Sequence, residues 1–313
     1  MNRCAFVFPG QASQQVGMGR DLHEQFPEAR PFFEQADATT GVSISTLCFE
    51  GPLDELTLTL NAQPALFTVS VACWHVLAAC GVRPVFVAGH SLGEWSAAVA
   101  AGAIDFESAL RLVTLRAQVM HEAPVGGMAA IIGLTRSQVE DLCDGVSEVG
   151  TVVAANLNAP DQIVISGDVV AIDCVMSEAM ELGASRAIRL NVSGAFHSPL
   201  MRQAQEEVAR AVEGVTFRMS ETPIIPNVSA DATKDGETIK TMLVRQMTAP
   251  VCWEESVRFL LEHGVNTFVE VGPGRVLSGL IRRIERRAVC IGVDDKASLD
   301  KAIKVLSREG GTK

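Results

Sequence analysis

A serine stands between two glycines in the segment Gly89-His90-Ser91-Leu92-Gly93. The segment fits the pattern G-x-S-x-G, in which a sharp turn from a strand into a helix exposes a serine hydroxyl. So short a pattern arises by chance in roughly one chain in ten of this length. Here an apolar run precedes it and an alanine-rich helical pattern follows it, so a helix N-terminus would place free N–H groups beside Ser91. The local sequence therefore favours a nucleophilic serine over a structural one.

A serine hydroxyl needs a base at neutral pH, and histidine is the side chain best suited to that role. The chain has six histidines: His23, His75, His90, His121, His197 and His263. His197 lies on a loop after a predicted strand, a position typical of catalytic groups. We expect His90 to orient the serine turn, whereas His121 lies near a helix end, where the dipole favours a cation. The other three lie in helical stretches, so the sequence prefers His197 without excluding the rest.

Arg116 lies on the apolar face of a helix predicted over Asp105–His121. Its neighbours on that stripe are Ala109, Leu112, Val113 and Met120. A buried guanidinium is costly unless a carboxylate or phosphate meets it. Two partners fit equally well: an acidic side chain of the protein, or a carboxylate on the substrate. In the second case Arg116 would select acyl groups that carry their own carboxylate.

The elements around these residues alternate between strands and helices. Strands are predicted over Arg3–Phe8, before Pro9-Gly10, and over Pro84–Ala88. Helices are predicted over Gln63–Cys80 and Glu94–Ala101. This order predicts an α/β fold with a buried, mainly parallel sheet.

A compact series of shorter elements begins near Gly126-Gly127. Strands are predicted over Met128–Ile132, Thr151–Asn156, Gln162–Ser166 and Ala187–Asn191, and helices over Ser137–Cys143 and Val170–Leu182. The order is βαββαβ, the ferredoxin-like pattern. We therefore expect a small inserted domain over residues 125–192. Residues 1–124 and 193–313 would form the large α/β domain.

Composition excludes several classes of function. The 313 residues are 48% hydrophobic and 20% charged, as in folded globular chains, and no apolar run approaches the roughly 18–20 residues of a membrane span. The net charge of −11 argues against nucleic-acid binding. The eight cysteines form no C-x-x-C pair, and no histidine has metal-ligand spacing. We expect reduced thiols in a cytoplasmic protein, with no metal site.

Four motifs together carry a resemblance to a known family. They are Phe8-Pro9-Gly10-Gln11 with Gln14-Gln15-Val16-Gly17-Met18-Gly19, the segment Gly89 to Glu94, Gly194-Ala195-Phe196-His197-Ser198, and Glu270-Val271-Gly272-Pro273-Gly274. In this order they resemble the malonyl-CoA:acyl carrier protein transacylases of bacterial fatty-acid synthesis, from Phe6 to about Leu280. The resemblance implies a hydrolase-like α/β domain with a ferredoxin-like insert, which agrees with the element order.

The resemblance also implies a role for each catalytic group. Ser91 would be the nucleophile, and His197 the general base and then the general acid for the departing thiol. The family orients this histidine with a main-chain carbonyl in place of an acid, and Gln246 matches that position. Malonyl would pass from coenzyme A to Ser91 and then to the phosphopantetheine thiol of the carrier protein, a ping-pong mechanism.

Binding roles follow from the same resemblance. Arg116 would clamp the malonyl carboxylate, and the main-chain N–H groups of Gln11 and Leu92 would form the oxyanion hole. Phe196 is similar to the malonyl-selecting form of the family, because its ring would crowd an α-methyl branch. The chain departs from the family at Ala12, where glycine is usual, and at Trp95, where tyrosine is commoner.

The acyl carrier protein of this family is typically acidic, so an acidic enzyme needs a local basic patch. We expect Arg186, Arg189, Arg282 and Arg283 to supply it, although the last two also fit a solvated helix face. We expect no cofactor besides the substrates, and a monomer.

Two other classes of function remain open. An α/β-hydrolase esterase shares the serine turn, but it takes oxyanion donors from an HGGG-type loop that this chain lacks, and it leaves Arg116 unexplained. A non-catalytic module that holds acyl carriers would need neither Ser91 nor His197.

Overall fold

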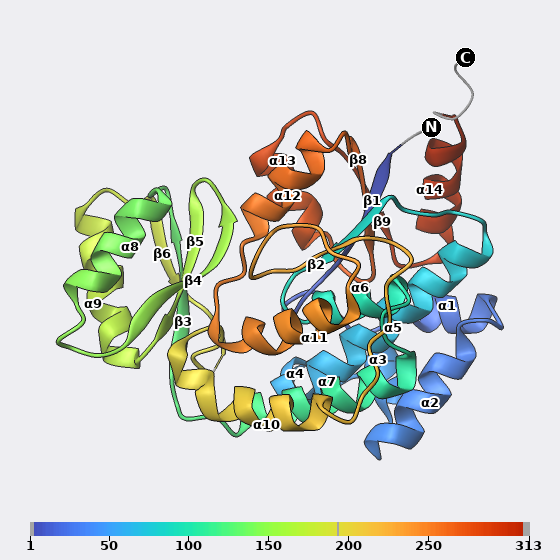
Figure 1. Cartoon of the computed structure of the whole chain (residues 1–313), viewed down its shortest axis with the longest axis horizontal. Helices are drawn as coiled ribbons and strands as arrows, with labels where there is room; N and C mark the ends of the chain where they lie inside the picture. The colour runs from blue at the N-terminus through green and yellow to red at the C-terminus, as the bar shows by residue number, and fades with distance from the viewer. Residues whose placement is uncertain (1–2, 193, 309–313) are drawn as a thin grey trace.

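Two β-sheets of different type organise the chain (Figure 1). The computed structural model describes residues 3–192 and 194–308. One sheet is parallel and has helices on both faces. The other is antiparallel and has two helices on one face. The predicted α/β class with a ferredoxin-like insert is confirmed.

The large sheet has five parallel strands in the order β7-β2-β1-β8-β9. The strands are β1 (Cys4–Phe8), β2 (Phe86–Gly89), β7 (Ile224–Ile225), β8 (Thr267–Val271) and β9 (Val289–Val293). Phe8 pairs with Gly89 in register, so β1 and β2 end at the same edge of the sheet. The loop after β1 and the serine turn after β2 therefore leave the sheet side by side, at the edge where parallel sheets bind ligands.

Both faces of this sheet are covered by helices. The helices outside the insert are α1 (Arg20–Gln25), α2 (Arg30–Thr40), α3 (Ile44–Glu50), α4 (Leu53–Thr57), α5 (Thr59–Ala79), α6 (Gly93–Ala100), α7 (Phe106–His121), α10 (Arg202–Val212), α11 (Gly236–Arg245), α12 (Trp253–Glu262), α13 (Val276–Ile284) and α14 (Lys296–Arg308). Short 3₁₀ turns cover Pro199–Met201 and Gln246–Thr248. Phe6 and Phe8 of β1 join the core that contains α5 and α7, whereas Ala5 and Val7 join the core that contains α12 and α13. Alternate residues thus face opposite layers, as a strand buried on both sides requires.

Helix α5 is the most apolar long helix among the described residues. It starts at Thr59, four residues before the predicted start, and holds Pro64 within its length. By length and composition it could cross a membrane, but 78% of its most apolar window is buried inside the fold. Its contacts with α7, α2 and α6 make it a core helix of the large layer.

The small sheet has the order β4-β5-β3-β6 and is antiparallel. Its elements are β3 (Gly127–Ile132), α8 (Arg136–Gly145), β4 (Val152–Ala159), β5 (Gln162–Gly167), α9 (Val169–Glu181) and β6 (Arg186–Arg189). The predicted βαββαβ order is confirmed, although β4 runs three residues past the predicted end and β6 ends two residues before it. The domain boundaries at 124/125 and 192/193 remain a prediction, and residue 193 lies outside the described residues.

Candidate active site

The serine turn joins β2 to α6, and glycines make it possible. Ser91 adopts a left-handed backbone with φ of 49°. A Cβ at Gly89 would lie 2.0 Å from the Gly93 carbonyl carbon, and a Cβ at Gly93 would lie 2.0 Å from the Phe8 carbonyl oxygen. Each side of the serine therefore requires a residue without a side chain, which is the physical content of the sequence pattern.

His197 lies in contact with the serine hydroxyl. The Ser91 Oγ to His197 Nε2 distance is 2.8 Å, and His197 Nδ1 lies 2.7 Å from the main-chain carbonyl oxygen of Gln246. Since a carbonyl can only accept, Nδ1 carries the proton and Nε2 is free to accept the serine proton. Burial, helped by the nearby Arg116 cation, lowers the pKa of His197 to about 3. The imidazole is therefore neutral at pH 7, as a base must be.

Arg116 lies beside the same hydroxyl and is 1% exposed. Its Nη2 donates to Ser91 Oγ at 3.1 Å and to Gln246 Oε1 at 3.0 Å, and its Nη1 donates to Gln63 Oε1. All three acceptors are neutral, and no carboxylate of the described residues lies within ion-pair distance of this guanidinium. Burial lowers the pKa of Arg116 to about 10, so the cation persists at pH 7. An acidic side chain in direct contact, one of the two partners expected from the sequence, is absent from the described part of the chain.

Side-chain amides hold the backbone of the serine turn. Asn227 Oδ1 accepts the Ser91 N–H at 2.7 Å, and its Nδ2 donates to the Gly89 carbonyl at 2.6 Å. The Gln246 amide donates to the Ser91 carbonyl at 3.0 Å. Sequence reasoning missed Asn227 and Gln63. A glutamine inside the apolar helix α5 is a signal that could have found Gln63, whereas Asn227 follows a two-residue strand with no local pattern.

These groups open onto a cavity of about 250 Å³. Its lining residues include Gln11, Ala12, His90, Ser91, Leu92, Arg116, Met120, Met128, Asn156, Leu190, Phe196 and His197. Six of the seven residues expected to act at the site therefore line one cavity. The seventh, Gln246, does not line it but hydrogen-bonds to Ser91, Arg116 and His197. Leu92 is the N-cap of α6, where main-chain N–H groups lack helical partners, and Gln11 follows the end of β1. Phe196 is also buried, with 5% of its surface exposed.

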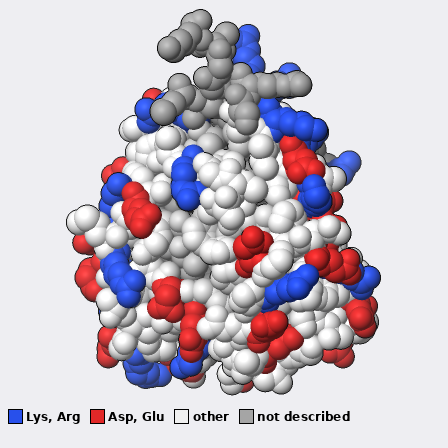
Figure 2. Space-filling model, turned by 90° about the vertical axis from the view of Figure 1, so that its right-hand side faces the viewer, with Lys and Arg blue, Asp and Glu red and all other residues white. Residues whose placement is uncertain are grey.

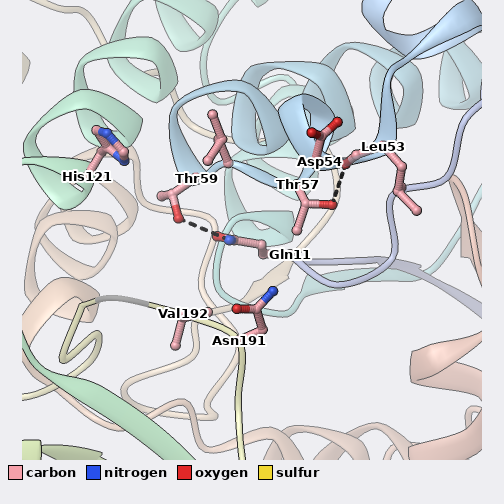
Figure 3. A pocket seen from close by; sticks show the side chains of 9 residues that line it. Gln11, Leu53, Asp54, Thr57, Thr59, His121, Asn191 and Val192 are labelled. Carbon is pink, nitrogen blue, oxygen red and sulfur yellow. Dashed lines mark hydrogen bonds between the residues drawn. The ribbon is translucent and has the colours of Figure 1, made fainter.

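A wider cavity of about 710 Å³ lies outside the first (Figure 3). The two share Gln11, Thr57, Asn191 and Val192, so they adjoin each other. Figure 3 shows Gln11 between α4, α5 and the 191–192 segment, with its amide on the Thr59 hydroxyl at 3.1 Å. The lining combines the apolar Leu53, Leu58 and Val192 with polar side chains and the carboxylate of Asp54. It contains no lysine or arginine among the described residues, which suits an amide-bearing chain better than a phosphate.

The four arginines expected to contact a carrier protein lie on two elements, β6 and α13. Arg186 and Arg189 are three residues apart on β6, so they point to opposite faces of the strand. Arg189 pairs with Asp173, and Arg283 on α13 pairs with Asp161 at 2.7 Å. Arg282 donates to the Cys290 carbonyl at 3.2 Å. On the side of the molecule that carries α1, α2 and α14, acidic and basic side chains are intermixed (Figure 2).

The two departures from the family pattern lie close to the serine in sequence or in space. Ala12 has φ of 79°, the left-handed backbone that favours glycine, and it lines the inner cavity. Trp95 is fully buried on α6, and its Nε1 has no hydrogen-bond partner within the described residues. Neither Ala12 nor Trp95 takes the place of a group that hydrogen-bonds to Ser91 or His197 among the described residues.

An α/β fold with a serine on a strand-to-helix turn, beside a histidine, defines the class of enzymes that use an acyl-serine. Comparison with known proteins narrows this class. A family model described as the acyl transferase domain matches residues 5–296. The malonyl CoA-acyl carrier protein transacylase of Bacillus subtilis (strain 168) is 46% identical over 99% of this chain and 99% of its own length. The chain belongs to the acyl transferase family, among the malonyl CoA-acyl carrier protein transacylases.

Solved structures agree with this placement. An acyl-carrier-protein S-malonyltransferase from Burkholderia pseudomallei 1710b superposes with a TM-score of 0.93, with 43% identity over 96% of this chain and 99% of that one. A malonyl-transacylase solved in complex with a type II PKS acyl-carrier protein superposes with a TM-score of 0.94, with 40% identity over 97% of this chain and 100% of that one.

Proposed function

We propose that this enzyme transfers a malonyl group from malonyl-CoA to the phosphopantetheine thiol of an acyl carrier protein, in fatty-acid biosynthesis. The observation that carries the proposal is the guanidinium of Arg116, which is buried against the Ser91 hydroxyl and donates only to neutral oxygens. A cation held in this way favours an acyl group that brings its own carboxylate. A simple esterase would have no use for it.

The first half-reaction forms an ester on the serine. As Ser91 Oγ attacks the thioester carbonyl carbon, its proton passes to His197 Nε2, which lies 2.8 Å away. The Gln246 carbonyl holds the imidazolium that forms. Main-chain N–H groups of Gln11 and Leu92 would meet the negative charge on the carbonyl oxygen. When the carbon–sulfur bond breaks, the imidazolium gives its proton to the departing thiolate of coenzyme A.

The second half-reaction repeats these steps in reverse with a different thiol. His197 takes the proton of the phosphopantetheine thiol, the sulfur attacks the malonyl ester, and Ser91 leaves with the proton returned. One thioester is exchanged for another, so neither a metal nor a redox cofactor is needed for the balance of atoms and electrons. Arg116 holds the malonyl carboxylate through both halves, and Phe196 restricts a branch at the α-carbon.

The outer cavity is the natural path for the arm that coenzyme A and the carrier protein share. Its polar side chains, Gln11, Thr57, Thr59 and Asn191, can hydrogen-bond the amides of pantetheine, and it adjoins the inner cavity that Ser91 lines. We retain Arg186, Arg189, Arg282 and Arg283 as our candidates for carrier contact. Arg189 and Arg283 form ion pairs, whereas Arg186 and Arg282 form none with the residues that the structure describes. The eight free cysteines fit a reducing cytoplasm, and we propose a monomer without membrane or nucleic-acid partners.

Intact-protein mass spectrometry after brief exposure to malonyl-CoA, acetyl-CoA or methylmalonyl-CoA tests the proposal. We expect a malonyl adduct on the wild type and none on Ser91→Ala. Arg116→Ala should lose at least about 100-fold in malonylation rate, because a charge-assisted bidentate contact disappears, and should gain in acetyl relative to malonyl transfer. Added carrier protein should discharge the adduct. Absence of any adduct with rapid release of free malonate would instead identify a thioesterase or esterase.

A further inference from the structure

Glu94 is a carboxylate in the first turn of α6, three residues after the serine, and no step of the proposed reaction uses it. The residue is 1% exposed. A carboxylate in the interior is costly unless donors surround it. Its donors come from the two residues that hold the rest of the site.

The first donor is the side chain of Gln246. Its Nε2 lies 2.6 Å from Glu94 Oε2, and its Oε1 accepts from Arg116. An ionised carboxylate can only accept and a guanidinium can only donate, so the amide between them has one possible orientation. The same residue presents its main-chain carbonyl to His197. Glu94 therefore fixes the residue that orients the base and supports the guanidinium.

The second donor is the main-chain N–H of Asn227, 3.0 Å from Glu94 Oε2. The Asn227 side chain accepts the N–H of Ser91 and donates to the carbonyl of Gly89. These bonds hold the left-handed backbone of the serine turn. One oxygen of Glu94 thus ties together the supports of the nucleophile, the base and the cation.

We propose that Glu94 is a positioning residue, which acts through Gln246 and Asn227 to keep the serine, histidine and arginine in one reactive arrangement. The inference deepens the proposed function and rests on it. Burial raises the pKa of Glu94 to about 7, while its two hydrogen bonds and the field of Arg116 oppose that rise. The positioning role rests on the two hydrogen bonds that Glu94 accepts, which a neutral side chain of the same length can also accept.

Two variants separate the length of this side chain from its charge. Glu94→Asp keeps the carboxylate and withdraws it by one methylene, whereas Glu94→Gln keeps the length and an oxygen that can accept both hydrogen bonds. We expect Glu94→Asp to lower the single-turnover rate of Ser91 malonylation about 100-fold, since a misplacement of about 1 Å has that cost. Its preference for malonyl over acetyl should fall about tenfold as Arg116 loosens. Glu94→Gln should stay within about fivefold of the wild type and keep the preference.

Glu270→Asp is the matched control, because Glu270 is another fully buried glutamate that accepts two main-chain N–H groups, at the start of α13. It should lower stability without changing the malonyl preference. If Glu94→Asp behaves like the wild type, or if Glu94→Gln falls as far as Glu94→Asp, the proposal is overturned. Should Glu94→Asp fail to fold, Gln246→Leu breaks the same contact and keeps the main-chain carbonyl. A wild-type rate and preference in that variant would overturn the proposal as well.

A neutral reagent separates this proposal from the proposed function. Phenylmethanesulfonyl fluoride sulfonylates an activated serine and carries no carboxylate, so its rate reports Ser91 and His197 alone. Slower sulfonylation in Glu94→Asp, with no malonyl adduct even on the wild type, would refute the malonyl function and leave the positioning role standing. Malonylation of the wild type, with both rates unchanged in Glu94→Asp, would refute the positioning role alone.

Discussion

Three residues with strained backbones meet at one cavity. Ala12, Ser91 and His197 have φ values of 79°, 49° and 60°, and all three line the space beside the nucleophile. A non-glycine residue in this conformation costs roughly 1–2 kcal/mol. Among the described residues, three of the four non-glycine residues with positive φ therefore lie at the candidate active site. Strained backbone is commonly found at active sites, where the surrounding structure holds it in place.

Ala12→Gly tests whether strain at this position is dispensable. Glycine removes the penalty of about 1–2 kcal/mol but adds about 0.5–1 kcal/mol of backbone entropy to the unfolded chain. We therefore expect the free energy of unfolding to stay level or rise by about 1 kcal/mol, measured by urea denaturation. Ala38→Gly, at an exposed position inside α2, should instead lose about 1 kcal/mol. Equal losses at both positions would show that the Ala12 backbone carries no strain.

Those site residues that stand in a recognisable local pattern could be predicted from the sequence. The glycines around Ser91 and the apolar stripe around Arg116 are local patterns, and both lead to the site. Gln63, Asn227 and the contacts of Glu94 depend on segments more than 50 positions apart, so no local pattern specifies them. The main-chain carbonyl of Gln246 carries no side-chain signature, and only the family resemblance pointed to it.

At the scale of elements, the alternation of strands and helices was sufficient to predict the α/β layers and the βαββαβ insert. The ends of elements were less predictable, because they depend on tertiary contacts. Strand β4 continues past Asn156 since Leu157 to Ala159 still pair with β5. This extension places Asn158 against His90, with 2.8 Å between Oδ1 and Nε2, and so joins the small sheet to the serine turn.

The packing of α6 against β1 is tight enough to test with one methyl group. In Gly93→Ala the new Cβ would lie 2.0 Å from the Phe8 carbonyl oxygen, so α6 must move away from the sheet and carry Ser91 with it. We expect a loss of about 3 kcal/mol in the free energy of unfolding and about 100-fold in acylation rate. Urea denaturation and single-turnover mass spectrometry measure the two.

Gly279→Ala is the control for this substitution. Gly279 lies within α13, with no atom within 4 Å of an added Cβ. Alanine there should raise stability by up to about 1 kcal/mol through helix propensity and leave acylation unchanged. If Gly93→Ala were as stable and active as this control, the close contact between α6 and β1 would not limit the position of the serine.

For the molecule as a whole, two buried groups of the site make opposite contributions to stability as pH changes. Burial raises the pKa of Glu94 from 4.5 to about 7, so the folded chain binds more protons than the unfolded chain between these values, and acidification through that range stabilises the fold. Burial lowers the pKa of His197 from 6.5 to about 3, so the unfolded chain binds more protons in that range, and acidification destabilises the fold. The two effects partly cancel between pH 6.5 and 4.5.

Glu94→Gln removes the contribution of Glu94 to this pH dependence and leaves that of His197. Above pH 7 the buried, ionised Glu94 lowers the free energy of unfolding of the wild type by on the order of 3 kcal/mol, given how far its pKa is raised. Protonation of Glu94 on acidification removes this cost. Relative to the wild type, the variant should therefore be most stable at pH 8 and lose about 3 kcal/mol of that advantage by pH 4.5. Urea denaturation of both proteins at pH 8, 6.5 and 4.5 measures the difference. Parallel curves would mean that Glu94 titrates alike in the folded and unfolded chains, and that burial does not raise its pKa.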